Sequence, residues 1–554
     1  MNIAPPPPYA EPSNGQFQSW DTQESDYKYS FEKPEKPIPS PSYDESFPIS
    51  TPKYNDKLFT YIFIATLTIF TYITYNSYSN LDLNPNLFIS DFFYQPEKIS
   101  KPIKALYTMI SISIIIPLLC SIALLLLVYI FPTFFVITAF LLIPLSMFSI
   151  SITSFISGSI FSGLMFGCFG FLTLMFMFQN FNRFSFSALM IKLIVSAMKK
   201  YPSTILISLL SSLLTAVISL IYMISISIIF NYRINKDDSI CQHSNGNDIC
   251  ISNTSILIFL FSIFSGCYIF QVLENITHVT LSGIFSSWYF FDTIDLNLKP
   301  KFPAFGSLKR ALTYCFGSIC FGSLLVSIIQ TIRISLQVLK AKLQNRNFSN
   351  NNLTDDDNDY GGGENGLLLC FLICIVSILE WIANEFEYWM RWFNRYAYSY
   401  LSMYGKPYLQ SARDTFEILK YKGIDILIND SLISTAISLY SMLSMIITGF
   451  TLYIIFTTWN IGGILEMGPE MLVIGGIIGL IICYFIVSSA INVLDVGCVT
   501  FMIGLAVDPD AFTRTNAGGA SESSIQRLQA WEQLSRYYPG IRERVMLDWP
   551  ENNN

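Results

Sequence analysis

The fold is decided by long apolar runs such as ALYTMISISIIIPLLCSIALLLLVYIF, residues 105–131, in which 27 residues follow one another without an Asp, Glu, Lys or Arg. An α-helix needs about 20 apolar residues to cross the roughly 30 Å hydrocarbon core of a bilayer. The chain contains ten such segments, at 58–78, 105–131, 133–154, 157–180, 203–230, 255–286, 310–337, 366–389, 432–456 and 472–494. Backbone groups in lipid must be hydrogen-bonded internally, and runs of this length suit helices better than the short alternating strands of a barrel. The sequence therefore predicts an all-α polytopic membrane protein with about ten transmembrane helices.

The composition of the chain supports this class. Of its 554 residues, 52% are apolar and only 13% are charged, against about 25% charged residues in an ordinary soluble protein. The net charge of −7 argues against a nucleic-acid partner, which would require a basic face. Neither histidine has the spacing of a zinc site, and we find no Walker loop, nucleophile elbow or cofactor fingerprint. We therefore expect a lipid-embedded protein that is not an enzyme and that has no metal and no cofactor.

Three regions differ in composition. Residues 1–57 hold eleven of the 25 prolines and no apolar period, which predicts a disordered tail. Residues 58–510 contain the helices and form the membrane domain, and residues 511–554 form a polar C-terminal tail. No cleavable signal peptide precedes the first helix, so this helix is expected to act as an uncleaved anchor. Ten spans would then leave both termini in the cytoplasm.

Loop charges and glycosylation sequons agree on this orientation. With the N-terminus inside, inner loops carry fourteen Lys and Arg residues, Arg391 and Arg395 among them, and outer loops carry eight, which follows the positive-inside rule. The sequons at Asn253, Asn347 and Asn352 all fall in predicted outer loops and predict a glycoprotein. Cys241 and Cys250 share one of these loops and are candidates for a disulfide.

The N-terminal tail contains a PPxY motif formed by Pro6, Pro7 and Tyr9. Proline-rich extended segments of this kind bind the aromatic grooves of WW domains. A WW-domain ubiquitin ligase is therefore a candidate partner. The alternative is a simple proline bias in a disordered tail.

The sixth apolar segment contains Glu274, Asn275 and His278 in the sequence ENITH. Ionisable residues within a membrane are costly and are functional candidates by default. Glu274 and His278 are four residues apart and share one helix face. A carboxylate beside an imidazole could bind a cation or transfer protons. The alternative interpretation is an interhelical hydrogen-bond cluster.

A second candidate site lies near the end of the eighth segment, where Glu380, Trp381 and Asn384 precede further tryptophans. A quaternary ammonium group has no N–H to donate, so aromatic faces and a nearby anion must bind it, each cation–π contact contributing about 0.5–2 kcal/mol. The alternative is an interfacial belt of aromatic residues.

Several motifs resemble the choline transporter-like family, most closely its fungal and protist branch. They are ITHVTLSGIFSSWYF at 276–290, FGSICFGSLLVSIIQTIR at 316–333, FNRYAYSYLSMYGKPYLQSARDTFEILKYKGIDILINDSLI at 393–433, DVGCVTFMIGLAVDPDAF at 495–512 and YYPGIRERV near the C-terminus. Within these motifs, the residues that we assign to the family signature are Trp288, Asn394, Tyr396, Gly405, Asp414, Asn429, Asp430, Asp508 and Pro509. We expect the third motif to form a cytoplasmic loop that serves as a gate or contains a lateral inner helix.

The resemblance implies a ten-helix solute carrier that transports choline, or ethanolamine in some members, without sodium and with proton exchange as one mode of coupling. The expected function is transport of choline or a related small organic cation by alternating access at the plasma membrane, although an internal membrane would suit the same chain. Two alternatives remain open. One is a transporter of a different solute on the same fold, and the other is a non-transporting scaffold that recruits partners through its PPxY tail.

Overall fold

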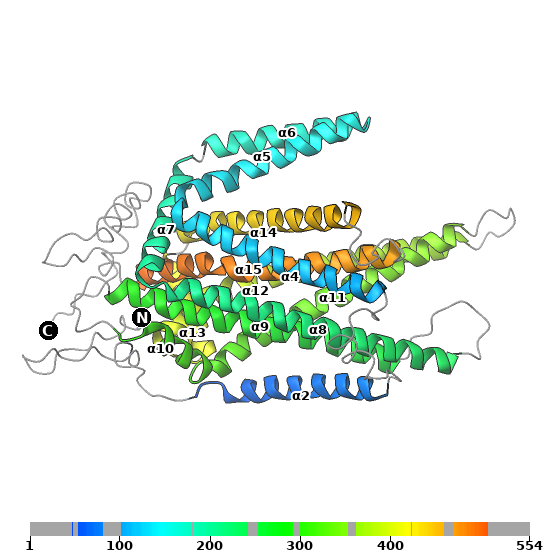
Figure 1. Ribbon diagram of the computed structural model, residues 1–554, viewed down its shortest axis with the longest axis horizontal. Helices are drawn as coiled ribbons and strands as arrows, with labels where there is room; N and C mark the ends of the chain where they lie inside the picture. Colours follow the sequence, from blue (N-terminus) through cyan, green and yellow to red (C-terminus); the bar gives the residue numbers. More distant parts are fainter. Residues whose placement is uncertain are drawn as a thin grey trace, which may run out of the picture.

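The computed structural model describes residue 47 and the ranges 54–80, 101–179, 181–241, 253–291, 300–352, 362–422, 424–458 and 469–507. In these ranges the chain forms helices and no strand (Figure 1). The helices are α2 (Lys57–Ser79), α4 (Lys101–Ile130), α5 (Pro132–Ile156), α6 (Ile160–Gln179), α7 (Phe181–Lys200), α8 (Ser203–Cys241), α9 (Asn253–Phe291), α10 (Pro303–Leu312), α11 (Phe316–Asn352), α12 (Gly362–Tyr404), α13 (Tyr408–Lys422), α14 (Ile424–Thr458) and α15 (Pro469–Val507).

Within the described part of the chain, ten of these helices are long and apolar enough to cross a membrane. They coincide with the ten predicted segments, so the predicted all-α class and the number of spans are confirmed. Several spans continue further than the sequence suggested, and two of these extensions bear on the site described below. The eighth, α12, runs on to Tyr404, and the tenth, α15, runs on to Val507. Polar and charged residues that appeared to follow these spans therefore lie inside helices.

The three helices that do not count as spans, α7, α10 and α13, gather at one end of the bundle, on the left of Figure 1. We call this end the short-helix end. Proline stands at the first position of α10, where a missing N–H costs no helical hydrogen bond. At the turn between α12 and α13, Gly405 has φ of +60°, a conformation that glycine adopts without a steric penalty.

The region 393–433, which we expected to be a loop, is instead a helical elbow. Its first residues continue α12, residues 405–407 form the turn, and α13 and the start of α14 follow. The predicted end of the eighth segment at residue 389 was wrong, because polar and aromatic residues such as Asn394 and Tyr396 resemble a loop in hydropathy. Both side chains are in fact buried against neighbouring helices, where their polar groups can find partners.

Helix α15 is the centre of the bundle, and its apolar window is 89% buried. Small polar residues of α8 bring the two helices together: Ser212 Oγ donates to Ile486 O at 2.9 Å, and Ser208 Oγ donates to Ala490 O. Hydroxyl-to-carbonyl bonds of this kind stabilise helix pairs in lipid, where no hydrophobic effect drives helix association.

The largest core cluster closes the bundle at the short-helix end. It joins residues 188–198 of α7 to the last turns of α9 and α15, with Trp288 fully buried and its ring 5.1 Å from that of Phe501. A chain of hydroxyls crosses the same region, since Thr500 Oγ1 donates to Ser282 Oγ at 2.9 Å and Ser282 Oγ lies 2.9 Å from Ser402 Oγ. This end is therefore a packed plug.

Helices α5 and α6 form a hairpin that stands apart at the top of Figure 1. Its two helices meet through glycines: Gly163 lies against the ring of Phe155, and Gly167 lies against Ser151. The spacing of these glycines therefore serves close packing within the hairpin. The turn between the helices contains Gly158, whose φ of +81° favours glycine.

Candidate transport cavity

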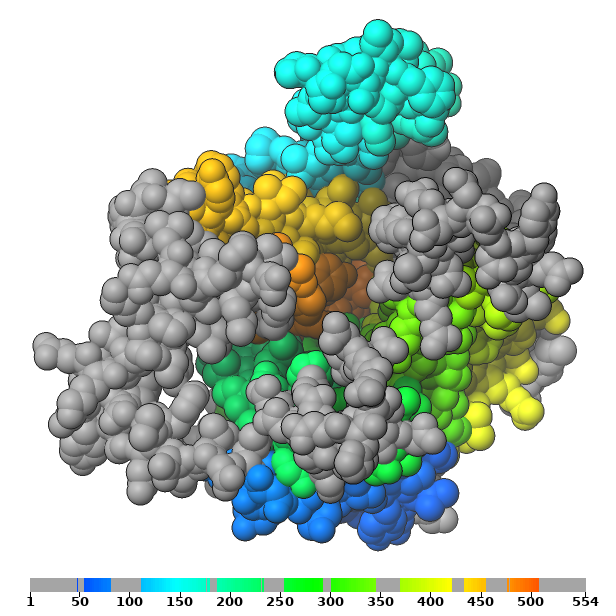
Figure 2. Space-filling model, turned by 90° about the vertical axis from the view of Figure 1, so that its right-hand side faces the viewer, coloured from blue at the N-terminus to red at the C-terminus, as the bar shows by residue number. Residues whose placement is uncertain are grey.

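A cavity of about 280 Å³ lies between α9, α11, α12, α14 and α15. Its lining is unusually polar for the middle of a membrane domain. The lining residues are Gln271, Glu274, Asn275, His278, Val326, Tyr388, Arg391, Trp392, Asn394, Arg395, Ser434, Ile437, Ser438, Tyr484, Ser488, Asn492 and Asp495. Figure 2 shows the end of the bundle opposite the short helices, where α15 forms the floor of a hollow between α14 and the green helices α8 and α9.

Helix α9 brings the three residues of the ENITH sequence to this cavity. His278 Nε2 lies 3.0 Å from Ser399 Oγ of α12, and Asn275 Nδ2 donates to Ser323 Oγ of α11 at 2.8 Å. Both side chains are buried, whereas Glu274 is exposed. Because Glu274 lines the cavity near the middle of the spanning part of α9, this exposed surface faces the cavity.

Helix α12 contributes a face of charged residues. Glu387, Arg391 and Arg395 follow at intervals of four, which places them on one side of the helix. Arg391 Nε donates to Glu387 Oε1 at 2.9 Å, and both arginines line the cavity. These two arginines were counted among the inner-loop charges, and that assignment was wrong, because α12 is longer than its apolar run.

Asp495 of α15 neutralises Arg395. Arg395 Nη1 lies 2.6 Å from Oδ1 and 2.7 Å from Oδ2 of Asp495. Ser434 Oγ of α14 donates to Asp495 Oδ1 at 2.9 Å and accepts from Arg395 Nη1 at 3.1 Å. Three helices therefore meet at one charge pair in the wall of the cavity.

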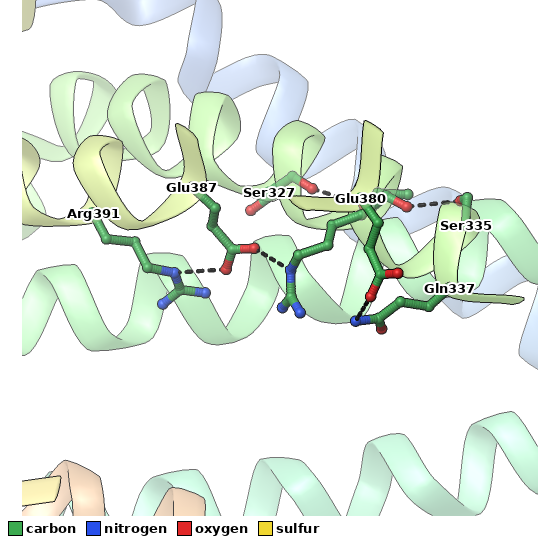
Figure 3. A network of polar contacts seen from close by, with 8 residues as sticks. Ser327, Ser335, Gln337, Glu380, Glu387 and Arg391 are labelled. Carbon is green, nitrogen blue, oxygen red and sulfur yellow. Dashed lines mark hydrogen bonds and ion pairs between the residues drawn. The ribbon is translucent and has the colours of Figure 1, made fainter. Parts of the chain in front are cut away.

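Glu387 neutralises part of a second basic cluster. Its Oε2 lies 2.6 Å from Arg333 Nε of α11, and its Oε1 accepts from Arg391. Figure 3 shows this carboxylate between the two helices, with Glu380 and Gln337 forming a separate contact further along. The side chain of Glu387 is only 8% exposed, so both arginines compensate for its desolvation.

Among the described residues, Asp495 and Glu387 both form ion pairs with arginines, whereas Glu274 does not. Within the described part of the chain it forms no ion pair, and its one hydrogen bond comes from Gln271 Nε2 at 3.5 Å. A carboxylate in a membrane cavity is costly unless a cation, a proton or water compensates for its charge. The cavity therefore offers a negative site at Glu274.

Three aromatic side chains complete the lining: Tyr388 and Trp392 from α12, and Tyr484 from α15. The Trp392 ring is held 4.8 Å from the ring of the buried Tyr396. Aromatic faces beside a carboxylate suit a cation without N–H groups. Among the residues that the structure describes, no group of three His, Cys, Asp or Glu side chains could hold a metal ion.

The residues of the second predicted site lie elsewhere. Glu380 pairs with Lys340 Nζ at 2.9 Å and accepts from Gln337 at 3.2 Å. Trp381 is 63% exposed, and Asn384 is also exposed. None of the three lines the cavity. The structure thus brings together one of the two predicted sets in the cavity and leaves the other outside it, along the helix pair α11–α12.

The signature residues that can be placed surround the elbow and the plug. Asn394 Nδ2 donates to Gly322 O of α11 at 3.2 Å and its Oδ1 accepts from the Tyr408 hydroxyl of α13, so it joins three helices. Burial raises the pKa of the Tyr408 phenol, which keeps it a hydrogen-bond donor.

Asp414 Oδ2 of α13 lies 2.6 Å from Lys406 Nζ and accepts from the Tyr400 hydroxyl at 3.2 Å. These contacts hold α13 against the turn that contains Gly405. These contacts place Asn394, Gly405 and Asp414 at the joint between α12 and α13.

Other predicted residues fall outside what can be described. Pro6, Pro7, Tyr9, Cys250, Asp508 and Pro509 lie outside the described residues. Six further residues lie in described helices, but only their backbone is described: Cys241, Asn253, Asn347, Asn352, Asn429 and Asp430.

Several cavity residues were missed at the level of sequence. Asp495 follows directly after the predicted end of the tenth segment, Trp392 was assigned to an interfacial belt, and Tyr388 was not singled out. The four-residue spacing of Glu387, Arg391 and Arg395 was the available clue, because such spacing indicates one helix face.

Comparison with known proteins agrees with this architecture. The model of a family described as plasma-membrane choline transporter matches residues 164–510. Protein PNS1 of Debaryomyces hansenii is 31% identical over 556 residues, covering 99% of both chains. Protein PNS1 of Kluyveromyces lactis is 31% identical over 98% of this chain and 92% of its own, and Protein PNS1 of Saccharomyces cerevisiae is 32% identical over 69% of this chain and 65% of its own. The resemblance to fungal members is thereby confirmed. The chain belongs to the choline transporter-like family and is a multi-pass membrane transporter of the choline-transporter type.

Proposed function

We propose that the protein carries choline, or a closely related small ammonium compound such as ethanolamine, across the plasma membrane by alternating access. The observation that carries the proposal is the Glu274 carboxylate, which lines a cavity within the membrane domain and forms no ion pair among the described residues. A bound cation would balance its charge.

The surroundings of Glu274 support this substrate class. Tyr388, Trp392 and Tyr484 line the same cavity, and their rings can contact methyl groups that carry part of the positive charge of choline. Because each such contact contributes about 0.5–2 kcal/mol, three rings and one carboxylate suffice for a weakly bound, exchangeable substrate.

The packing of the two ends supports alternating access. The large core cluster packs the short-helix end, while the opposite end is hollowed in Figure 2. Most predicted inner Lys and Arg residues lie at the short-helix end, and the sequons near Asn253, Asn347 and Asn352 lie at the other end of α9 and α11. This distribution favours a cytoplasmic short-helix end, so the conformation corresponds to an outward-facing carrier.

Such a carrier would move its substrate inward with the help of the membrane potential, which contributes about 2.3 kcal/mol per charge at 100 mV. His278 lies one helical turn from Glu274 and lines the same cavity, so it is the candidate for coupling uptake to protons.

Uptake into proteoliposomes tests the proposal. We expect the purified protein to take up labelled choline in a saturable manner that excess unlabelled choline competes away, with Glu274→Gln reducing kcat/KM at least about tenfold, as for a lost charged contact. Glu380→Gln is the matched control, because Glu380 lies outside the cavity and pairs with Lys340, and we expect it to retain uptake.

Two results would contradict the proposal. Absence of choline uptake by folded protein would indicate a different solute or a scaffold role, and deletion of residues 1–50 then separates these two, because only a scaffold should lose its phenotype. Equal activity of Glu274→Gln and the wild type would exclude Glu274 as the countercharge.

A further inference from the structure

Two arginines compete for one carboxylate next to the cavity. Arg333 of α11 and Arg391 of α12 each bind Glu387 through Nε, at 2.6 and 2.9 Å. One carboxylate therefore faces two guanidinium groups, and this cluster retains one positive charge. Glu387 alone cannot balance both arginines, and the charge of Arg391 also acts on Glu274, which lines the same cavity.

Arg333 and Arg391 differ in the surroundings of their guanidinium groups. Arg391 lines the cavity and Arg333 does not. Because Arg391 uses Nε for Glu387, its two terminal nitrogens are left over, and in Figure 3 they point away from that carboxylate. The side chain of Arg391 is 37% exposed. Arg395, in contrast, uses Nη1 on both oxygens of Asp495.

The cavity thus presents opposite charges from two neighbouring helices, the Glu274 carboxylate of α9 and the Arg391 guanidinium of α12. A simple cation would engage only the first of them. A molecule with an ammonium group at one end and an oxygen acceptor at the other would engage both, since the planar guanidinium offers N–H donors in a fixed geometry.

We propose that Arg391 is the specificity-determining residue of this carrier and that it donates hydrogen bonds to the oxygen of the substrate. This inference rests on the proposed function and extends it from a cation to an ammonium compound that bears an oxygen. Choline satisfies it through its hydroxyl group, whereas tetramethylammonium has the same charged group and no oxygen.

Binding and uptake of these two compounds test the inference. The affinities of the full-length protein in nanodiscs for choline and for tetramethylammonium are measured for the wild type, Arg391→Met, Arg391→Lys and Arg333→Met. We expect the wild type to prefer choline about tenfold, as for one hydrogen bond to a charged group. Arg391→Met should bind both compounds equally, and Arg391→Lys should restore part of the preference.

Arg333→Met is the matched control. Like Arg391→Met, it removes one positive charge and one ion-pair contact with Glu387, but Arg333 does not line the cavity. We expect it to keep the choline preference even where it lowers the melting temperature. A merely structural role of Arg391 would instead change both arginine variants alike.

The outcomes separate the two proposals. If the wild type binds choline and Arg391→Met keeps the preference over tetramethylammonium, Arg391 does not recognise the oxygen and this inference alone is wrong. If Arg333→Met loses the preference together with Arg391→Met, the effect comes through Glu387 and the inference is likewise overturned. If the folded wild type binds neither compound, both the inference and the proposed function are wrong.

Discussion

Nη1 of Arg395 lies within 2.7 Å of both carboxylate oxygens of Asp495, so that one cation of α12 and one anion of α15 form a closed pair in the wall of the cavity. This pair removes both charges from those available to a substrate. The pair also joins α12 to α15. These two helices must separate, or tilt together, if the cavity is to open at the short-helix end.

The Arg395–Asp495 pair makes a first prediction. Asp495→Asn leaves the guanidinium without its counter-charge, and we expect a lower free energy of unfolding. Breaking a buried ion pair costs about 3–5 kcal/mol, and because the Arg395 side chain is 25% exposed, the lower end of that range applies. Denaturant unfolding in micelles measures the change.

A double variant provides the control for this first prediction. Arg395→Met with Asp495→Asn should cost less than the sum of the two single changes, because neither charge is then left alone. Additive effects in this cycle would show that the two side chains do not stabilise each other.

The aromatic lining makes a second prediction. Trp392→Leu removes one ring from the cavity while keeping an apolar side chain, and we expect KM for choline to rise about two- to thirtyfold, which corresponds to about 0.5–2 kcal/mol for a cation–π contact. Trp381→Leu should leave KM unchanged, because Trp381 lies outside the cavity and is exposed. Uptake kinetics measure both, and equal KM values for the two variants would contradict the cation–π role.

His278 makes a third prediction, on pH. A protonated imidazole would add a positive charge close to Glu274 and would compete with a cationic substrate, so choline uptake should rise with pH over a range of about pH 5.5 to 8 where His278 exchanges protons with the cavity. Other groups around the cavity are Arg391, Arg395 and Asp495. Of these, the arginines stay charged over this range. His278→Ala should show a flatter profile that lies near the high-pH level of the wild type.

A variant of the hydrogen-bond partner controls the pH experiment. Ser399→Ala keeps the imidazole and removes only the hydroxyl that lies 3.0 Å from His278 Nε2, so its uptake should still depend on pH. An unchanged pH profile of His278→Ala would exclude the proposed role in proton coupling.

Gly322 makes a fourth prediction, on packing. A Cβ atom there would collide with the hydroxyl of Tyr398 and would lie 2.6 Å from the ring of Tyr408. Both tyrosines are buried, so they have little room to move. We expect Gly322→Ala to lower the melting temperature and the yield of folded protein, whereas Gly476→Ala, with nothing within 4 Å of its Cβ, should match the wild type. Equal melting temperatures for the two variants would refute the close approach of α11 to α12.

Asp56 makes a fifth prediction, on the closed end of the bundle. Its carboxylate accepts hydrogen bonds from Ser318 Oγ at 2.6 Å and from the backbone N–H of Tyr408 at 2.9 Å, and so ties the start of α2 to α11 and α13. Asp56→Ala should reduce stability by about 1.5–3 kcal/mol, typical of a lost hydrogen bond to a charged group. It should also speed hydrogen exchange at the elbow, while Lys57→Ala, an exposed neighbour, should not.

Asparagine at position 56 provides a further check. Asp56→Asn keeps one acceptor oxygen and should lie between the wild type and Asp56→Ala. Identical exchange rates in all of these proteins would mean that Asp56 does not hold the elbow closed.

The sequence predicted the spans well and their ends poorly. Hydropathy locates where an apolar run begins, and α2 and α8 begin within one residue of their predicted starts. It fails where a helix continues with polar residues, as in α12 beyond Trp389 and in α15 beyond Leu494. Those continuations contain Arg391, Arg395 and Asp495, and their charges would be typical of a loop unless neighbouring helices neutralise them.

By itself, the sequence determined the all-α class, the ten spanning helices and the family, because each depends on local apolar length or on contiguous motifs. It also identified Glu274, Asn275 and His278, since polar residues deep within an apolar run are costly and therefore conspicuous. Only the tertiary structure decided which charges cancel. Asp495 and Arg395 are 100 positions apart in the chain, and Glu387 and Arg333 are 54 apart, so their pairing depends on how α11, α12 and α15 pack. The Glu274 carboxylate stays available in the cavity because the other charges there are paired. No local pattern in the sequence could distinguish Glu274 from Glu380.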